Sequence, residues 1–326
     1  MAPSLLDTFR VLASFSPERI SLRGAPWDAY TDWAVAQGLA PLAAYNLEYR
    51  LGGAGAPEWV RDRLLSVYQG SLNDNVMKLV NFKRAIGALE GRRVVVLGAA
   101  SFAEALFPHV AFRPVPDLDL LVARMDLNPL AAFLAEAEFK PVSRSARTRV
   151  LSDGRTQITL HGGFLGAGFE TEEKGVLERA MPMRALGPSV YRLTAEDAVL
   201  SVVLGQAQGG YSVPYIEFVD LRELLLGAPS TQGAYSHPLN VELIRKLAAA
   251  WRIERALYTS TRIVAGLFPA AQMIADRLTP KLRRATRTLL DSLVVAPLAS
   301  LGRMREIRGA ERLRRLLSGG RSASTS

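Results

Sequence analysis

The feature that most constrains the fold of this sequence is a short block of strand-type residues between two long stretches with helical periodicity. Residues 94–97 read VVVL and end at Gly98, and residues 118–122 read LDLLV. Short β-branched, apolar runs of this kind predict buried strands that end in tight turns. Segments 148–151 and 156–161, separated by Ser-Asp-Gly, predict a hairpin. The sequence therefore predicts an α/β (α+β) chain with a small mixed sheet flanked by helical regions.

The remaining residues divide the chain into parts. The 326 residues suffice for about two domains. Four regions are expected: an N-terminal helical region over 1–90, an α/β core over 91–192, a C-terminal helical region over 193–278, and a basic helical tail over 279–326 with a disordered end. Within them the sequence predicts helices that open at Ser16-Pro17 and at Pro57-Glu58, an amphipathic helix over 72–89, short helices near Ser101–Phe107 and from Asn128, and helices over 195–207, 216–226, 240–251, 254–267 and 280–295.

Composition excludes several kinds of site. The chain has no cysteine, which rules out disulfides, cysteine-bound zinc, iron–sulfur clusters and thiol catalysis. Its three histidines, His109, His161 and His237, are far apart in the sequence, so a histidine-rich metal site is not expected. No window approaches about 18 uninterrupted apolar residues, and the first residues do not read as a signal peptide. These features predict a cytoplasmic protein without a transmembrane segment.

Positive charge is concentrated near the C-terminus. The formal net charge is +9, and residues 281–326 hold eleven basic residues against three acidic ones. Three interpretations of the segment 281–315 stay open. The first is a solvated pair of terminal helices with an arginine-rich exterior. The second is a binding site for nucleic acid, and the third is a binding site for an anionic membrane surface. Nothing in the segment indicates recognition of particular bases.

Two carboxylates form the strongest chemical signal. Asp117 and Asp119 are two residues apart at a predicted strand, so both side chains point to the same face while the leucines between and after them point to the core. Carboxylate oxygens held in this way suit Mg²⁺ or Mn²⁺, with a triphosphate supplying further ligands. Gly98 closes the preceding strand at a turn whose amides are suited to a phosphate, and Arg113 is suited to pair with one. The alternative is a solvent-facing strand edge with two acids and a neighbouring ion pair.

The segment VVVLGAASFAEALFPHVAFRPVPDLDLLV at 94–122 resembles the core of the uncharacterised nucleotidyltransferase family of the polymerase-beta-like nucleotidyltransferase superfamily. In that family a strand ends in Lys-Gly, an arginine follows, and Asp-x-Asp lies on the next strand. Gly98, Arg113, Asp117 and Asp119 occupy those places. The resemblance covers roughly residues 30–270, including GLAPLAAYNLEYRL, ITLHGGF, LTAEDAVLSVVLGQAQ and PYIEFVDLRELL.

The resemblance implies Mg²⁺-dependent transfer of a nucleoside monophosphate from a nucleoside triphosphate to a hydroxyl acceptor of unknown identity. The hydroxyl would attack the α-phosphorus in line, and pyrophosphate would leave. Asp117 and Asp119 would bind the metal and Arg113 would stabilise charge. The residues expected to approach the triphosphate are Gly98, Ala99 and Ser101. Asp220 matches a family aspartate, with a helix cap or a buried ion pair as the alternative.

Two departures from the family pattern bear on activity. The family lysine before the glycine is Leu97 here, and the third carboxylate falls on Thr159, although His161 keeps its place. A threonine hydroxyl carries no negative charge. The alternative function is therefore a catalytically degenerate member that binds a nucleotide or a macromolecular partner without turnover. A third hypothesis is a scaffold protein whose functional surface is the basic C-terminus.

Overall fold

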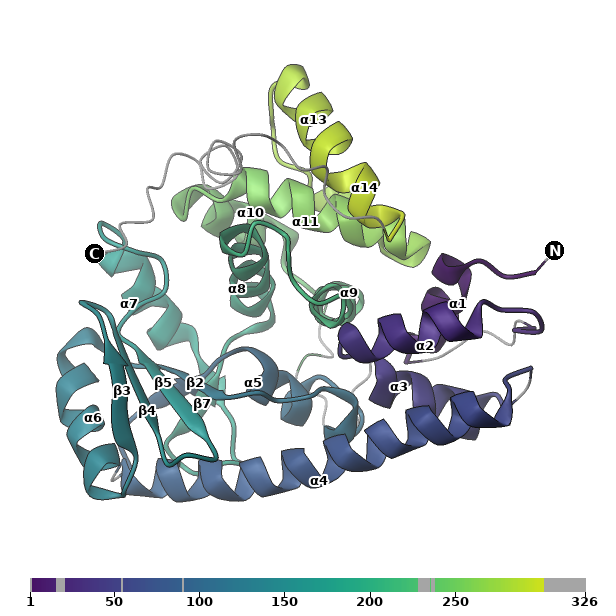
Figure 1. Cartoon of the computed structure of the whole chain (residues 1–326). Helices are drawn as coiled ribbons and strands as arrows, with labels where there is room; N and C mark the ends of the chain where they lie inside the picture. Colours follow the sequence, from purple (N-terminus) through teal and green to yellow (C-terminus); the bar gives the residue numbers. More distant parts are fainter. Residues whose placement is uncertain are drawn as a thin grey trace.

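The computed structural model describes residues 2–15, 21–53, 55–89, 91–227, 235 and 238–301. The N-terminal part is helical, as predicted, and one long helix forms its base (Figure 1). A capping box between Ser4 and Asp7 starts the first helix. The elements of this part are α1 (Leu5–Leu12), α2 (Trp27–Ala36), α3 (Ala40–Tyr45), the π-helical η1 (Asn46–Arg50) and α4 (Glu58–Ala88). Helix α4 unites the helix predicted to open at Pro57 with the one predicted over 72–89.

A seven-stranded mixed sheet forms the middle of the chain, which confirms the predicted fold class. Its strand order is β3-β4-β5-β2-β1-β7-β6, with β2–β5 and β1–β7 parallel and the other neighbours antiparallel. The strands are β1 (Val94–Val96), β2 (Leu118–Leu121), β3 (Lys140–Arg144), β4 (Thr148–Ser152), β5 (Gln157–His161), β6 (Met181–Pro182) and β7 (Val190–Arg192). The predicted strands and the hairpin are present, whereas β3, β6 and β7 were not predicted.

Successive side chains of the central strands point to opposite faces of the sheet, and the two faces belong to two different hydrophobic clusters. Leu118 and Leu120 of β2 join α4 and the helix α6 (Leu127–Glu136) in one cluster. Leu121, on the opposite face, joins a larger cluster that reaches the N-terminal and C-terminal helices. Between the strands lie the helix α5 (Gly98–Ala105), the short 3₁₀ turns η2 (Val110–Phe112) and η3 (Arg124–Asp126), and α7 (Glu170–Arg179). The sheet is thus covered on both faces, with β3 left exposed at one edge.

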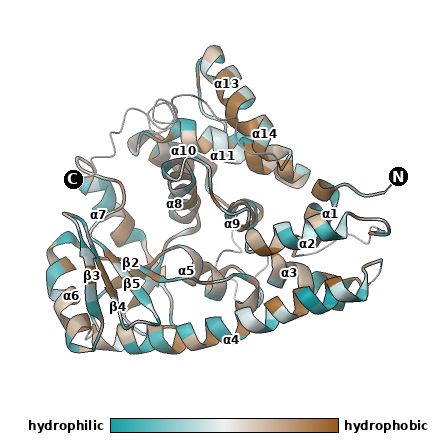
Figure 2. Cartoon of the chain, viewed as in Figure 1, coloured by the Kyte–Doolittle hydropathy of each residue, from teal (hydrophilic) through white to brown (hydrophobic). Residues whose placement is uncertain are grey.

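Helices return after β7, as predicted. Thr194 caps α8 through its side chain, in line with the capping signal at this position. The elements are α8 (Ala195–Gln208), α9 (Ile216–Leu226), α10 (Val241–Ala250), α11 (Glu254–Leu267), η4 (Pro269–Ala271), α12 (Gln272–Leu278), α13 (Arg284–Leu290), η5 (Asp291–Val295) and α14 (Ala296–Ala299). No described helix combines the length and the apolar composition needed to span a membrane. In Figure 2, α4 alternates between hydrophilic and hydrophobic colours along its length.

Several element boundaries differ from the predictions. Helix α5 begins at Gly98 rather than near Ser101, because Leu97 already occupies the N-cap position in an extended conformation. The helix predicted over 280–295 begins at Arg284 and continues through a π-helical turn, and its side with Leu290 and Val294 is buried in the larger cluster. The helix start at Ser16-Pro17, His237 and most of the basic tail lie outside the described residues.

Candidate active site

The two predicted metal-binding carboxylates lie at the centre of the sheet. Asp117 directly precedes β2 and Asp119 is inside it, so both side chains lie on the face opposite Leu118 and Leu120. The side chain of Asp119 is 44% exposed, whereas the two leucines are fully buried. Partial burial raises the pKa of Asp117, and the nearby charge of Asp119 raises it further, against the opposing effect of Lys78. The pair is therefore accessible and carries mutual repulsion that a bound cation would relieve.

Strand β5 places two further side chains beside this pair. Thr159 is the register partner of Asp119 in the parallel β2–β5 ladder, and it is almost buried. His161, two residues further along the same face, has its Nε2 atom 2.9 Å from Oδ1 of Asp119. The imidazole thus holds one carboxylate oxygen in place and leaves Oδ2 of Asp119 without a hydrogen bond to a described residue. The position that faces Asp119 most directly carries a hydroxyl group and no charge.

The start of α5 lies beside the carboxylates. Strand β1 is antiparallel to β2, and the amide of Leu97 donates a hydrogen bond of 2.9 Å to the carbonyl oxygen of Asp119. Gly98 then turns the chain into α5 with a φ of +56°, which a glycine adopts without strain. No side chain caps this helix, so its first amides are available to an anion. Ser101, in the first turn of α5, is buried, and its hydroxyl lies 3.4 Å from the hydroxyl of Tyr235.

Arg113 is paired with an acidic residue of the C-terminal helices. Its guanidinium forms a bidentate pair with Asp220 of α9, with Nε and Nη2 both donating at 2.9–3.0 Å, while Nη1 donates to the carbonyl oxygen of Pro114. Both side chains are buried. The structure thus assigns Asp220 to the buried ion pair considered for it and joins the segment before Asp117 to the C-terminal helices.

Comparison with known proteins identifies the group to which the chain is related. A family model described as "uncharacterised nucleotidyltransferase" matches residues 23–269. The chain belongs to this family. No curated protein and no solved structure matches significantly. Nucleotidyl transfer is therefore the general activity that the family supports, and the strands bearing Asp117, Asp119 and Thr159 lie inside the matched region.

This nucleotidyltransferase holds its Asp117 segment through one face of α4, a feature that sequence periodicity did not reveal. The side chain of Asn75 donates to the carbonyl oxygens of Val110 and Arg113 and accepts from the amide of Val115. Lys78, one turn further on, donates to the carbonyl oxygen of Val115 at 2.7 Å. Asn75 is 2% exposed, so its three hydrogen bonds are shielded from water. In the sequence Asn75 stands beside other polar residues of α4, so nothing marks it as buried.

Two acids on segments near the sheet, Asp153 and Glu170, are paired with arginines in this nucleotidyltransferase. Asp153 accepts from Arg84 and from the amides of its own turn. Glu170 accepts from Arg147, which also binds Glu173. These contacts hold each acid in a local structural role.

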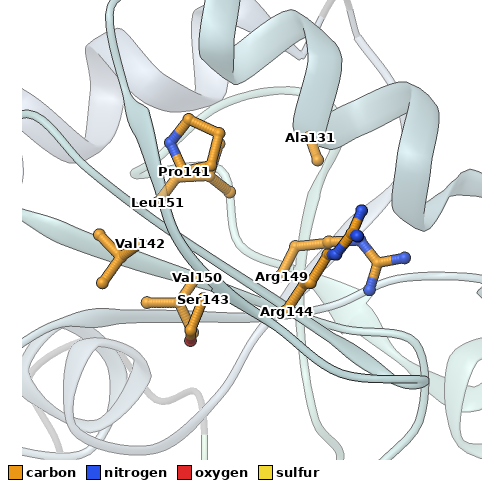
Figure 3. A pocket seen from close by; sticks show the side chains of 8 residues that line it. All are labelled: Ala131, Pro141, Val142, Ser143, Arg144, Arg149, Val150 and Leu151. Atoms are coloured by element: carbon orange, nitrogen blue, oxygen red, sulfur yellow. The ribbon is translucent and has the colours of Figure 1, made fainter.

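A pocket between α6 and strands β3 and β4 lies apart from the carboxylates of β2. It encloses about 440 Å³ and has the side chains of Arg144 and Arg149 at one side (Figure 3). Arg149 is occupied, since it donates to Asn128 and to the carbonyl oxygens of Ser145 and Thr148. Strand β5 separates β4 from β2. The pocket thus has no direct connection along the sheet to Asp117 and Asp119.

Glu217 of α9 is expected to make the stability of the protein depend on pH. Burial raises the pKa of Glu217 to about 7, and the charge of Asp220 adds to this effect while Arg113 opposes it. The folded chain therefore retains a proton that the unfolded chain releases near its ordinary value of 4.5. Between these two pKa values the free energy of unfolding should fall as pH rises, by at most about 1.4 kcal/mol per pH unit.

Denaturant unfolding at pH 5, 6, 7 and 8 measures this dependence in the wild type and in Glu217→Gln. In the variant the free energy of unfolding should no longer show the decrease with pH that Glu217 causes. At pH 8 the variant should be at least as stable as the wild type. Parallel slopes in the two proteins between pH 5 and 7 would contradict the assignment to Glu217.

Proposed function

We propose that this nucleotidyltransferase transfers a nucleoside monophosphate from a Mg²⁺- or Mn²⁺-bound nucleoside triphosphate to a hydroxyl acceptor, in the manner of polymerase-beta-like enzymes. The observation that carries the proposal is the placement of Asp117 and Asp119 on one accessible strand face beside the uncapped start of α5. Family membership supports nucleotidyl transfer in general, and this geometry supports the metal-dependent form of it.

The residues present fit a divalent cation. Asp117 and Asp119 offer hard carboxylate oxygens on one accessible strand face. Burial raises the pKa of Asp117, and the charge of Asp119 raises it further. Among the described residues no group of three or more acidic or histidine side chains is arranged for metal binding, so triphosphate oxygens and water would complete the coordination. When bound, the ion supplies positive charge to the triphosphate.

The chain's own residues have distinct roles in this proposal. The amides of Gly98 and Ala99 approach the triphosphate at the start of α5, where the helix dipole favours negative charge. Ser101 lies in the same first turn, and its hydroxyl orients towards Tyr235. His161 orients the carboxylate of Asp119. The buried contact with Asp220 favours a positioning role for Arg113, through the segment that leads to Asp117.

The acceptor hydroxyl must lose its proton during the transfer. In the proposed site Thr159 lies next to Asp119, where its hydroxyl forms hydrogen bonds but does not serve as a base at neutral pH. Nucleotide binding depends on Asp117 and Asp119 and is compatible with this threonine. The rate of transfer is the quantity that the missing charge would lower, by about 10²–10⁴-fold.

Replacing Thr159 by aspartate is therefore expected to increase the release of pyrophosphate from ATP by about 100-fold or more, since it adds a carboxylate next to Asp119. The measurement is a steady-state pyrophosphate assay with Mg²⁺ or Mn²⁺ in excess, in which water replaces the unidentified acceptor hydroxyl as the nucleophile and AMP is the second product. Thr159→Asn is the matched control, because it adds a side chain of nearly the same size without charge. Equal rates for Thr159→Asp and Thr159→Asn would contradict the role given to this position.

The neutral residue at position 159 also favours a second candidate function, which is binding of a nucleotide or a macromolecular partner without turnover. Metal-dependent ATP binding in the wild type, together with turnover only in Thr159→Asp, would support this alternative. Binding of nucleic acid or of an anionic surface through 281–315 stays a prediction, because the described residues include only the first part of that segment.

A further inference from the structure

A second surface outside the nucleotide site has the composition of a ligand site. Five aromatic rings come together where the end of α3 and the adjoining η1 lie near α4 and η2, and one guanidinium lies over the first of these rings. We call this group the aromatic ledge; its members are Tyr45, Tyr49, Tyr68, His109, Phe112 and Arg50. None of these residues contributes to the proposed nucleotide site.

The rings of the aromatic ledge form a continuous row. The centroid of the Tyr45 ring lies 5.3 Å from that of Tyr49 and 4.6 Å from that of Phe112. The His109 ring lies 5.4 Å from Phe112 and is stacked on Tyr68 at 6.0 Å with an interplanar angle of 27°. These separations are typical of favourable aromatic contacts. The row is therefore a preorganised surface rather than a set of independent side chains.

The outer part of the ledge is open to solvent, although its centre is buried. Tyr49 is 62% exposed and His109 is also exposed, whereas Phe112 is 3% exposed. The hydroxyl groups of Tyr45, Tyr49 and Tyr68 form no hydrogen bond with another described residue, and the imidazole of His109 uses only Nδ1, as an acceptor. The ledge thus offers ring faces together with neutral hydrogen-bonding groups that have no partner within the described chain.

Backbone structure holds the ledge in place. Tyr49 and Arg50 belong to the π-helical segment η1, a rare conformation that is frequent at functional sites. The ledge also adjoins the segment that leads to Asp117. Ser71 and Asn75, on the face of α4 that continues from Tyr68, bind the carbonyl oxygens of Ala111 and Val110. Lys78, which donates to the carbonyl oxygen of Val115, lies ten residues after Tyr68 on α4. These ten residues correspond to a rise of about 15 Å along the helix axis, which is the distance along α4 between the ledge and the residue that contacts the Asp117 segment.

The charge of the ledge favours a neutral ligand. Arg50 is the cation that lies over a ledge ring, 5.7 Å from the centroid of Tyr45. The neighbouring Arg61 is neutralised by Glu48, to which both its Nε and its Nη2 donate. A nucleic-acid strand requires several free cations along its backbone, and the ledge offers one. Phenol hydroxyls both donate and accept, as sugar hydroxyls do, and the C–H face of a sugar ring complements the negative face of an aromatic ring.

We propose that the aromatic ledge binds a ring of a neutral oligosaccharide, stacked on Tyr49, and that this oligosaccharide is the hydroxyl acceptor of the enzyme. The acceptor assignment rests on the proposed function, whereas binding of the sugar at the ledge does not. The rise of about 15 Å along α4 between Tyr68 and Lys78 favours an acceptor of more than one ring, so that one ring contacts Tyr49 while the reacting hydroxyl of another extends towards Asp117.

Saturation-transfer NMR with the full-length chain tests the proposal. The probes are three neutral trisaccharides, built of glucose, mannose or N-acetylglucosamine, with a thymidine trinucleotide for comparison. Saturation is expected to reach the C–H protons of at least one trisaccharide, and Tyr49→Ala should weaken that binding by about tenfold or more. Trp59→Ala is the matched control, since Trp59 is an exposed aromatic residue of α4 outside the ledge and its loss should leave binding unchanged.

Three outcomes would overturn the proposal: transfer to none of the trisaccharides, equal binding by the wild type and Tyr49→Ala, or binding of the trinucleotide at Tyr49 instead. Tyr49→Ala should retain the melting temperature of the wild type, because the side chain is mostly exposed. Calorimetric titration with Mg²⁺ and ATP separates this proposal from the proposed function. Sugar binding without ATP binding would reject nucleotidyl transfer and leave the ledge as a sugar site, and ATP binding without sugar binding would reject only the ledge.

Discussion

Replacing both Asp117 and Asp119 by asparagine is expected to abolish Mg²⁺-dependent binding of ATP, as measured by isothermal titration calorimetry. The two carboxylates are the charged groups on the accessible face of β2, and asparagine retains their shape without their charge. We expect affinity in the presence of Mg²⁺ to fall by about 100-fold or more, since loss of even a supporting group at a metal site commonly costs about 10–100-fold.

Two features keep this result interpretable. The substitutions remove two charges whose burial and mutual repulsion both raise the pKa of Asp117, so the melting temperature of the double variant should equal or exceed that of the wild type. Asp74→Asn is a control for the change in net charge, because Asp74 lies exposed on α4. If the double variant bound ATP as the wild type does, or if wild-type binding did not depend on Mg²⁺, the metal site would not be at Asp117 and Asp119.

Replacing Asp220 by asparagine is expected to lower the free energy of unfolding by about 3–5 kcal/mol, measured by denaturant unfolding. Asp220 is 1% exposed and accepts three hydrogen bonds from Arg113, which is itself buried. The substitution leaves the guanidinium without a counter-charge in a place where water cannot replace it. Breaking a buried ion pair is costly for this reason, even where the intact pair contributes little.

A double variant separates the cost of an unpaired charge from the loss of packing. Arg113→Met combined with Asp220→Leu removes both charges and retains most of the volume, so it should recover most of the stability that Asp220→Asn loses. A loss below about 1 kcal/mol in Asp220→Asn would show that the pair does not have the burial described here. Asp220 does not contact the nucleotide in the proposed site. Asp220→Asn should therefore lower nucleotide affinity only indirectly, through a displacement of the segment from Arg113 to Asp117.

The sequence predicted the local features of the site well. The two-residue spacing of Asp117 and Asp119 in an apolar strand suffices to place both on one face, because side chains alternate in any β-strand. The hairpin that carries Thr159 and His161 was also predictable from its short turn and strand-type residues. The pairing of β5 with β2 was not, because register between strands that are separated by about forty residues depends on the whole sheet.

The contacts that position the site were less accessible to sequence reasoning. The guanidinium of Arg113 is equally suited to bind a phosphate or a carboxylate. It binds Asp220 because α9 packs near the segment that follows η2, and this packing cannot be read from the sequence. Asn75 reads as one polar residue among several on α4, and its burial depends on the loop that covers it. Strand β3 escaped prediction because it is exposed along its whole length and shows no apolar alternation.

The sequence by itself determined the mixed fold class, the helical flanks, the absence of cysteine chemistry and the pairing of two carboxylates on one strand face. These depend on composition and on short-range periodicity, which backbone geometry imposes on any chain. Tertiary structure alone decided that Thr159 faces Asp119, that Arg113 binds Asp220, and that five aromatic rings from three separate segments form one surface. Each of these depends on contacts between residues far apart in the chain, which local preferences leave open and which packing of the complete core determines.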